Sequence, residues 1–153
     1  MRNFVHFLTG NLVLNLCIFS WLFAQVLKVI IYYIRNRRLD FHYLISSGGM
    51  PSSHSSVVCT CATAVGCIQG WSSVTFAVTV VLAFIVMYDA ANVRKAAGEQ
   101  AKILNYIMEH RKEMRPEFLS KELKELLGHT PIQVLAGAVL GIAVGLLGTF
   151  LYA

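Results

Sequence analysis

The sequence predicts an all-α fold, a polytopic bundle of transmembrane helices. Hydrophobic residues make up 56% of the 153 residues and charged residues only 14%, whereas a soluble domain carries about 25% charged residues. The deficit falls in a few long apolar stretches, which is typical of helices that lie in lipid. The basic residues are confined to segments that flank these stretches. We therefore expect one integral membrane domain over residues 1–153.

Four stretches are expected to form membrane helices, at residues 11–34, 55–68, 72–88 and 131–152. The second is short, because a full span takes roughly 20 residues. It is expected either to be extended by residues 52–54 or to lie tilted behind a re-entrant approach. Gly70 indicates a tight turn before the third stretch. No small-residue cleavage site follows the first stretch, so we expect that span to remain in the mature protein.

The polar segment 89–128 lies between the third and fourth stretches. From Ala90 to about Glu113, apolar residues recur at three- and four-residue spacing, which predicts an amphipathic helix that continues out of the third span. These apolar residues are Val93, Ala97, Ala101, Leu104 and Met108. Pro116 interrupts the pattern, and residues 117–127 are expected to form a second short helix.

The distribution of basic residues predicts the orientation in the membrane. They follow the first span or lie between the third and fourth: Arg35, Arg37, Arg38, Arg94, Lys95, Lys102, Arg111, Lys112, Arg115, Lys121 and Lys124. With four spans both segments lie on one side, which the positive-inside rule assigns to the cytoplasm of a cell (inner or plasma) membrane. The net charge of +5 thus indicates anionic headgroups or a phosphorylated ligand as partners, and no nucleic acid.

Small residues inside the spans are interpreted as packing devices. Gly137, Gly141 and Gly145 form one face of the fourth span, which favours close approach of another helix. That neighbour is either the second span of the same chain or the fourth span of a second copy, and the latter predicts a homodimer. The cysteines form no CxxC pair, so we expect no metal site and no disulfide; they are Cys17, Cys59, Cys61 and Cys67.

Polar side chains gather at the predicted cytoplasmic ends of the helices. A lone interfacial lysine or histidine is more often an anchor at the membrane surface. Here several polar side chains converge at one depth, and because burying polar groups in the membrane is unfavourable, their convergence favours a functional site. They are Lys28, Arg35, His54, Asp89, Arg94 and His129. Cations and backbone amides at a helix start suit phosphate binding, and two histidines suit a nucleophile and an acid.

These residues resemble the motifs of the type 2 phosphatidic acid phosphatase superfamily, which includes the vanadium haloperoxidases. The sequence Pro51-Ser52-Ser53-His54 is similar to its Pro-Ser-Gly-His motif. Lys28 and Arg35 have the spacing of its first motif, with Asn36 where the motif has proline. The stretch from His129 to Gln133 resembles the second half of the third motif.

The third motif departs from the family pattern at two positions. Gln133 stands where the family has the aspartate that orients its nucleophilic histidine, and Leu123 stands where it has an arginine. The arrangement of Tyr88-Asp89, Val93-Arg94, Gly98 and Gln100 resembles the short, divergent bacterial branch of the superfamily. This second resemblance covers nearly the whole chain.

The resemblance implies hydrolysis of a lipid phosphate without a metal or other cofactor. Lys28 and Arg35 would bind phosphate oxygens, together with Ser52 and Ser53 as hydroxyl and amide donors. The substrate class stays open among phosphatidic acid, phosphatidylglycerophosphate and polyprenyl phosphates or diphosphates.

The resemblance also implies the roles of the two histidines. His129 would attack phosphorus to give a phosphohistidine, and His54 would protonate the leaving group. Two further roles are hypotheses from this sequence alone: Arg94 replaces the missing arginine, and Asp89 orients a histidine in place of Gln133.

Two other classes of function compete with a phosphatase. One is a lipid-phosphate binding or transport protein that has lost turnover, which the altered third motif favours. The other is a structural membrane protein whose polar residues only anchor the helix ends. Measured turnover separates the first two classes, and specific binding of a phosphorylated lipid separates the last two.

Overall fold

The computed structural model confirms a helical membrane bundle. It describes residues 9–39, 44, 48–110 and 129–152, except for the side chains of residues 93–95 and 108–110. In these ranges the regular elements are the α-helices α2 (Leu12–Asn36), α3 (Ser53–Gln69), α4 (Val74–Tyr88), α5 (Arg94–His110) and α6 (Pro131–Tyr152), with the π-helix η2 (Asp89–Val93) between α4 and α5.

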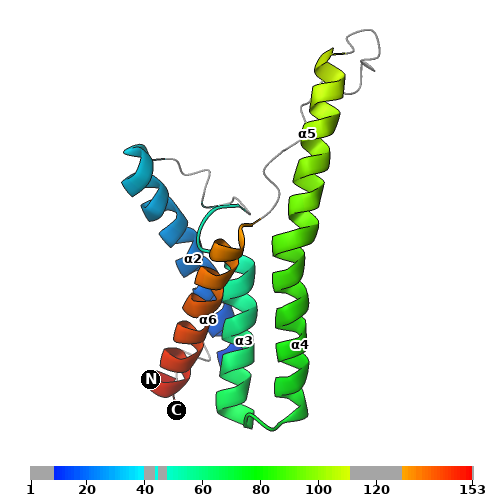
Figure 1. Ribbon diagram of the computed structural model, residues 1–153. Coiled ribbons are helices and arrows are strands. Elements are labelled where there is room, and N and C mark those ends of the chain that lie inside the picture. The colour runs from blue at the N-terminus through cyan, green and yellow to red at the C-terminus, as the bar shows by residue number, and fades with distance from the viewer. Residues whose placement is uncertain (1–8, 40–43, 45–47, 111–128, 153) are drawn as a thin grey trace.

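Helix α3 occupies the centre of the bundle and contacts α2, α4 and α6. Helices α2 and α6 lie on one side of it and α4 on the other (Figure 1). The starts of α3 and α6 lie at the same end of the bundle as the junction of α4 and α5. The start of α2 and the end of α6 lie at the opposite end.

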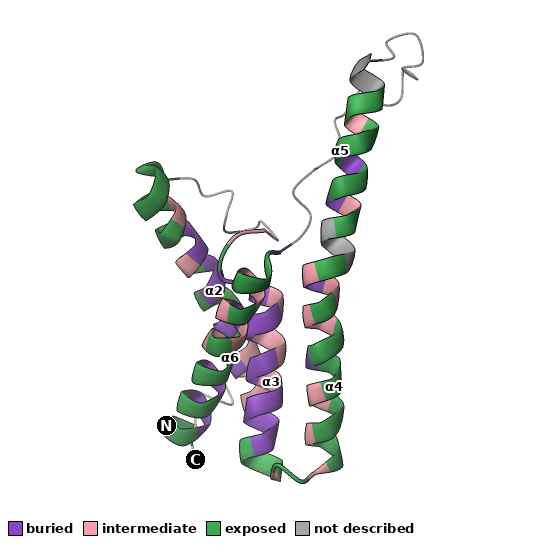
Figure 2. Ribbon diagram, in the orientation of Figure 1, coloured by how far each residue is buried: buried purple, intermediate pink, exposed green. Residues whose placement is uncertain are grey.

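Three helical segments are long and apolar enough to cross a membrane: Leu12–Asn36, Val74–Ile107 and Pro131–Tyr152. The predicted second span is the 17-residue α3, which begins at Ser53 and so includes His54. Figure 2 shows that α3 is more buried than the helices around it. Because protein covers this helix on several sides, its many serines and threonines need not face lipid.

Side-chain caps set the starts of three helices. The side chains of Asn11, Ser52 and Ser73 each accept a hydrogen bond from a backbone N–H in the first turn of α2, α3 and α4. Such caps satisfy donors that the helix leaves without partners. At Ser52 the cap places the first turn of α3, and with it His54, directly after the cis peptide bond of Met50–Pro51.

The amphipathic helix predicted after the third span is present as α5, which continues from α4 through η2. It projects beyond the bundle (Figure 1), with Ala101 buried and Leu104 half exposed. Pro116 and the short helix expected at 117–127 lie outside the described residues.

The glycine face of α6 packs against α3 of the same chain. A Cβ atom added at Gly137 would meet the backbone oxygen of Ser52, and one at Gly141 would meet that of Ser56. At Gly145 the added atom would lie 2.7 Å from Cβ of Thr63. Of the two neighbours open from sequence, the second span of the same chain therefore fills this role. The close approach needs no second copy.

A buried chain of hydrogen-bonded hydroxyl groups joins α2, α3 and α6. Ser20 Oγ of α2 lies 2.6 Å from Ser56 Oγ and 2.9 Å from Thr60 Oγ1, both on α3. The hydroxyl of Thr60 also donates to the backbone oxygen of Gly141 on α6, at 3.0 Å. Interhelical hydrogen bonds of this kind hold helices together in lipid, where apolar burial gives little preference for one neighbour over another.

Substitution of Gly141 by alanine tests this packing. The added methyl group would overlap the backbone of α3, and overpacking of a tight contact costs about 1–3 kcal/mol. We expect Gly141→Ala to lower the thermal unfolding temperature in detergent. The matched control Ala143→Val enlarges an exposed position of the same helix and should leave that temperature nearly unchanged. Equal temperatures for wild type and Gly141→Ala would contradict the packing role.

Candidate functional site

Two histidines from different helix starts face each other at one end of the bundle. The rings of His54, in the first turn of α3, and His129, just before α6, have centroids 5.9 Å apart and an interplanar angle of 64°. His129 is 3% exposed, whereas His54 is half-buried. The sequence predicted that these two residues would converge although 75 positions separate them (129 minus 54).

The side chain of Gln133, in the first turn of α6, is hydrogen-bonded to the ring of His129. Its side-chain oxygen lies 3.1 Å from Nδ1 of His129 and accepts a hydrogen bond, also of 3.1 Å, from the backbone N–H of Thr130. The backbone N–H of Gln133 in turn donates to the hydroxyl of Thr130. This reciprocal pair is a capping box, which fixes the first turn of a helix. The ring of His129 is thereby hydrogen-bonded to the first turn of α6.

Lys28 supplies a buried cation beside the first turn of α3. The residue is 2% exposed, and its Nζ atom donates to Ser53 Oγ at 3.2 Å. Ser53 and the N-cap Ser52 are also buried. The backbone N–H of Ser52 donates to the backbone oxygen of Gln133 at 3.0 Å. Lys28, Ser53, His54 and His129 are called the dihistidine site below.

The π-helix η2 connects the α4–α5 junction to this site. The backbone N–H of His129 donates to the backbone oxygen of Ala90 at 3.0 Å. A π-helix shifts the backbone pairing of the surrounding helix, and such turns are frequent at functional sites. Asp89 begins this element and is half-buried. Arg94 begins α5 directly after it, but its side chain lies outside the described residues.

Arg35 does not share the environment of Lys28. It lies in the last turn of α2 and is exposed, at the end of the helix that diverges from the bundle in Figure 1. Seven residues of helix advance about 10 Å along the axis. Of the two cations in the first motif, Lys28 is therefore the one that the fold buries against α3.

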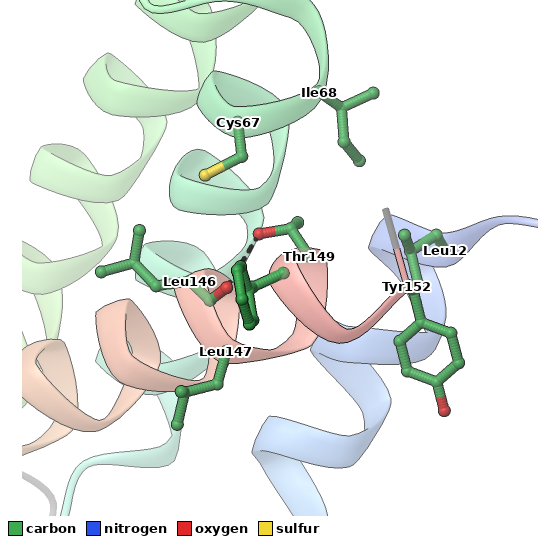
Figure 3. Close-up of a pocket in the computed structure, with 8 residues that line it drawn as sticks. Leu12, Cys67, Ile68, Leu146, Leu147, Thr149 and Tyr152 are labelled. Atoms are coloured by element: carbon green, nitrogen blue, oxygen red, sulfur yellow. Dashed lines mark hydrogen bonds between the residues drawn. The ribbon is translucent and has the colours of Figure 1, made fainter.

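Two cavities among the described residues lie away from the dihistidine site. One of about 890 Å³ lies at the opposite end of the bundle, between the start of α2 and the ends of α3 and α6 (Figure 3). A second of about 520 Å³ lies between α2 and α6. Both have mainly apolar walls. Within the described ranges, no group of three or more histidine, cysteine, aspartate and glutamate side chains could hold a metal ion.

Sequence reasoning did not assign a role to Gln133, which contacts His129, or to Gln25, which is buried in α2. Gln133 was noted only as a departure from the family pattern, although the Thr130-x-x-Gln133 spacing of a capping box is visible in the sequence. Gln25 lies one turn before Lys28 and is 5% exposed, and its side-chain oxygen has no hydrogen-bond partner in the described part of the protein. A glutamine inside an apolar span was the available signal for it.

Comparison with known proteins places the chain in a family. The family model described as "Divergent PAP2 family" matches residues 9–144. The chain belongs to the Divergent PAP2 family. A relative from Bacillus subtilis (strain 168), "Uncharacterized membrane protein YuiD", is 42% identical over 142 residues, which covers 86% of this chain and 89% of the relative. No solved structure matches the chain.

Membership of the Divergent PAP2 family confirms the resemblance inferred from the motifs. It relates the protein to a phosphatase-related superfamily, and the matched relative is a membrane protein, in agreement with the three apolar helices of membrane length.

The contrast between Lys28 and Arg35 gives a test of the site. We expect Lys28→Met to weaken binding of inorganic phosphate or orthovanadate at least about tenfold, because hydrogen bonds to a charged group contribute about 1.5–3 kcal/mol. Arg35→Met, a matched loss of one cation on the same helix, should weaken it less. Titration calorimetry of the purified protein in detergent measures both. Equal losses would show that the exposed arginine binds the anion as strongly as the buried lysine.

Proposed function

We propose that this protein is a lipid-phosphate phosphatase that works through a phosphohistidine at the cytoplasmic face of the membrane. The observation that carries the proposal is the pairing of His54 and His129, two rings presented by separate helix starts beside a buried lysine. Family membership supports it, since the superfamily is phosphatase-related. The substrate would be a phosphate or diphosphate monoester whose lipid tail remains among the helices.

The chemistry divides between the two histidines. Nε2 of His129 attacks phosphorus as the bond from phosphorus to the leaving oxygen breaks, and His54 in its protonated form gives that oxygen a proton. Water then attacks the phosphohistidine, with His54 accepting its proton, which releases inorganic phosphate and restores both residues. The ring separation of 5.9 Å allows one phosphate ester to contact both.

Binding of the phosphate rests on charge and on backbone dipoles. Lys28 supplies a positive charge, and Ser52 and Ser53 lie at the start of α3. The starts of α3 and α6 both point their N-terminal ends at this region, and helix N-termini favour anions. Arg35 and Arg94 are proposed as further phosphate ligands on the basis of the first motif and the α4–α5 junction. Asp89, the first residue of η2, is proposed to orient a histidine of the dihistidine site.

The direct test is phosphate release by purified protein in detergent, with a chelator present and a panel of lipid phosphates as substrates. We expect His54→Ala to lower turnover by roughly 10²–10⁴-fold, the usual contribution of general acid catalysis. His129→Ala should lower it to background. Gln69→Ala changes an exposed residue at the other end of α3 and serves as the control that should retain turnover. A fully active His129→Ala variant would exclude the phosphohistidine.

A binding or transport protein is the second candidate. The arginine missing from the third motif favours it, because charge neutralisation at phosphorus supplies much of the catalysis in phosphoryl transfer. Specific binding of one lipid phosphate by wild type, with no release of phosphate from any lipid in the panel, would establish this function instead. A second copy of the chain as a partner remains a proposal.

The proposed orientation makes its own prediction. In a background without native cysteines, a cysteine introduced at exposed Glu99 of α5 should react with a membrane-impermeant maleimide only after cells are permeabilised. One introduced at exposed Ser72, in the turn at the opposite end, should react in intact cells. The reverse pattern of labelling would place the dihistidine site outside the cell and contradict the positive-inside assignment.

A further inference from the structure

The cavity between α2 and α6 combines buried residues with exposed apolar walls. Leu16, which is 6% exposed, and the buried Gly148 both line it. A Cβ atom added at Gly148 would meet the side chain of Leu16, so the glycine lets the two helices approach closely here. The rings of Phe19 and Phe23 stack with centroids 5.9 Å apart and line the same space. This cavity, of about 520 Å³, is called the α2–α6 groove below.

The length of the groove matches one leaflet of a bilayer. Its lining residues recur at the spacing of a single helix face and include Leu12, Asn15, Leu16 and Phe19 of α2 and Leu147 and Leu151 of α6. The lining on α2 runs from Leu12 to Phe23, which is about 16 Å of helix. Half of the hydrocarbon thickness of a bilayer is about 15 Å. The groove is therefore as long as one leaflet is deep.

The groove lies in the leaflet opposite the dihistidine site. Leu12 begins α2 and Tyr152 ends α6, and both line the groove at the end of the bundle away from that site (Figure 1). Tyrosine is enriched where membrane meets water. The side chain of Asn15, also in the lining, accepts a hydrogen bond of 2.7 Å from the exposed hydroxyl of Thr9. These polar groups indicate that the groove begins at the membrane surface and runs toward the middle of the bilayer.

The chemistry of the groove suits a hydrocarbon chain. No charged side chain lines it, and the described residues at this end of the bundle, 9–12, 66–76 and 149–152, carry no charge. Its exposed walls, among them Leu22 and Leu147, continue the apolar surface that the spanning helices present to lipid. A transmembrane helix of a second copy would need about 30 Å of matching surface, whereas the groove offers about half of that length. An acyl chain ends near mid-bilayer, as the groove does.

We propose that the α2–α6 groove binds one fatty acyl chain of a bilayer phospholipid, in the leaflet opposite the dihistidine site. Lipid tails are as apolar as the groove walls, so the fit of the chain between the helices selects the occupant, and transfer from water contributes nothing. The chain contacts α2 and α6 together and so stabilises the position of α2, which carries Lys28. The proposal does not depend on the phosphatase function.

Photolabelling of the wild-type protein tests the site directly. The protein would be reconstituted in phosphatidylcholine vesicles in which a small share of the lipid carries a diazirine on its acyl chain. After irradiation, mass spectrometry of peptides maps the adducts. We expect severalfold more adducts at Phe19 and Leu147 than at Val78 and Leu82 of α4, which are comparably exposed and also lie toward the start of α4 at this end of the bundle. Equal labelling of both pairs would show general solvation by lipid and overturn the proposal.

A groove-filling variant provides the second test. Leu147→Trp places a larger ring in the groove, and Val139→Trp is the matched control at an exposed position of α6 outside it. We expect Leu147→Trp to lower adducts at Phe19 by about tenfold, the change that follows a loss of roughly 1.4 kcal/mol of packing. Val139→Trp should retain them. Undiminished labelling of Phe19 in Leu147→Trp would contradict binding in the groove.

Thermal unfolding separates loss of the lipid from loss of the fold. A ligand that binds only the folded state raises its stability, so added phosphatidylcholine should raise the unfolding temperature of wild type and of Val139→Trp in detergent. Leu147→Trp should unfold cooperatively and respond less to the lipid. An equal rise in all three proteins would overturn the proposal. Crosslinks from a photoreactive residue at position 19 to a second copy of the chain would assign the groove to a dimer and likewise overturn it.

Discussion

The close contact between α3 and the glycine face of α6 is the constraint on which the rest of this structure depends. At Gly137 and Gly141 the two backbones approach so closely that a methyl group would overlap the backbone of α3. Ser52 and Gln133 are also joined by a backbone hydrogen bond, which places the starts of α3 and α6 side by side. The contact therefore determines where His54 and His129 lie relative to each other.

Hydrogen bonds hold the residues of the dihistidine site in place without a large soluble domain. His54 lies in the first turn of α3 behind the cap at Ser52, and His129 is tied to the first turn of α6 by Gln133. Backbone atoms hold both helices in register, and the buried hydroxyl chain adds α2, which carries Lys28. Lys28 and His54 thus lie on helices, and His129 lies directly before one, whose positions relative to one another are fixed by hydrogen bonds.

Much of the fold and of the site follows from the sequence, for identifiable reasons. Apolar length predicts α2, α4 and α6, and the three- and four-residue spacing of apolar residues predicts the helical continuation into α5. The motifs at Lys28, His54 and His129 indicate convergence because all three lie at the same end of their helices. What the sequence does not contain is the neighbour of the glycine face, which packing alone decides, or the orientation of the Gln133 side chain, which depends on Thr130.

The neutral residue at position 133 would suit the proposed binding of a phosphate at a poorly solvated site. His129 is 3% exposed and Lys28 is 2% exposed, so water screens charges here only weakly. A carboxylate at this position would repel the phosphate that Lys28 is proposed to bind, and its own burial would be unfavourable. The amide oxygen accepts the same hydrogen bond from His129 without either effect. A phosphate bound as proposed would therefore meet no negative charge from position 133.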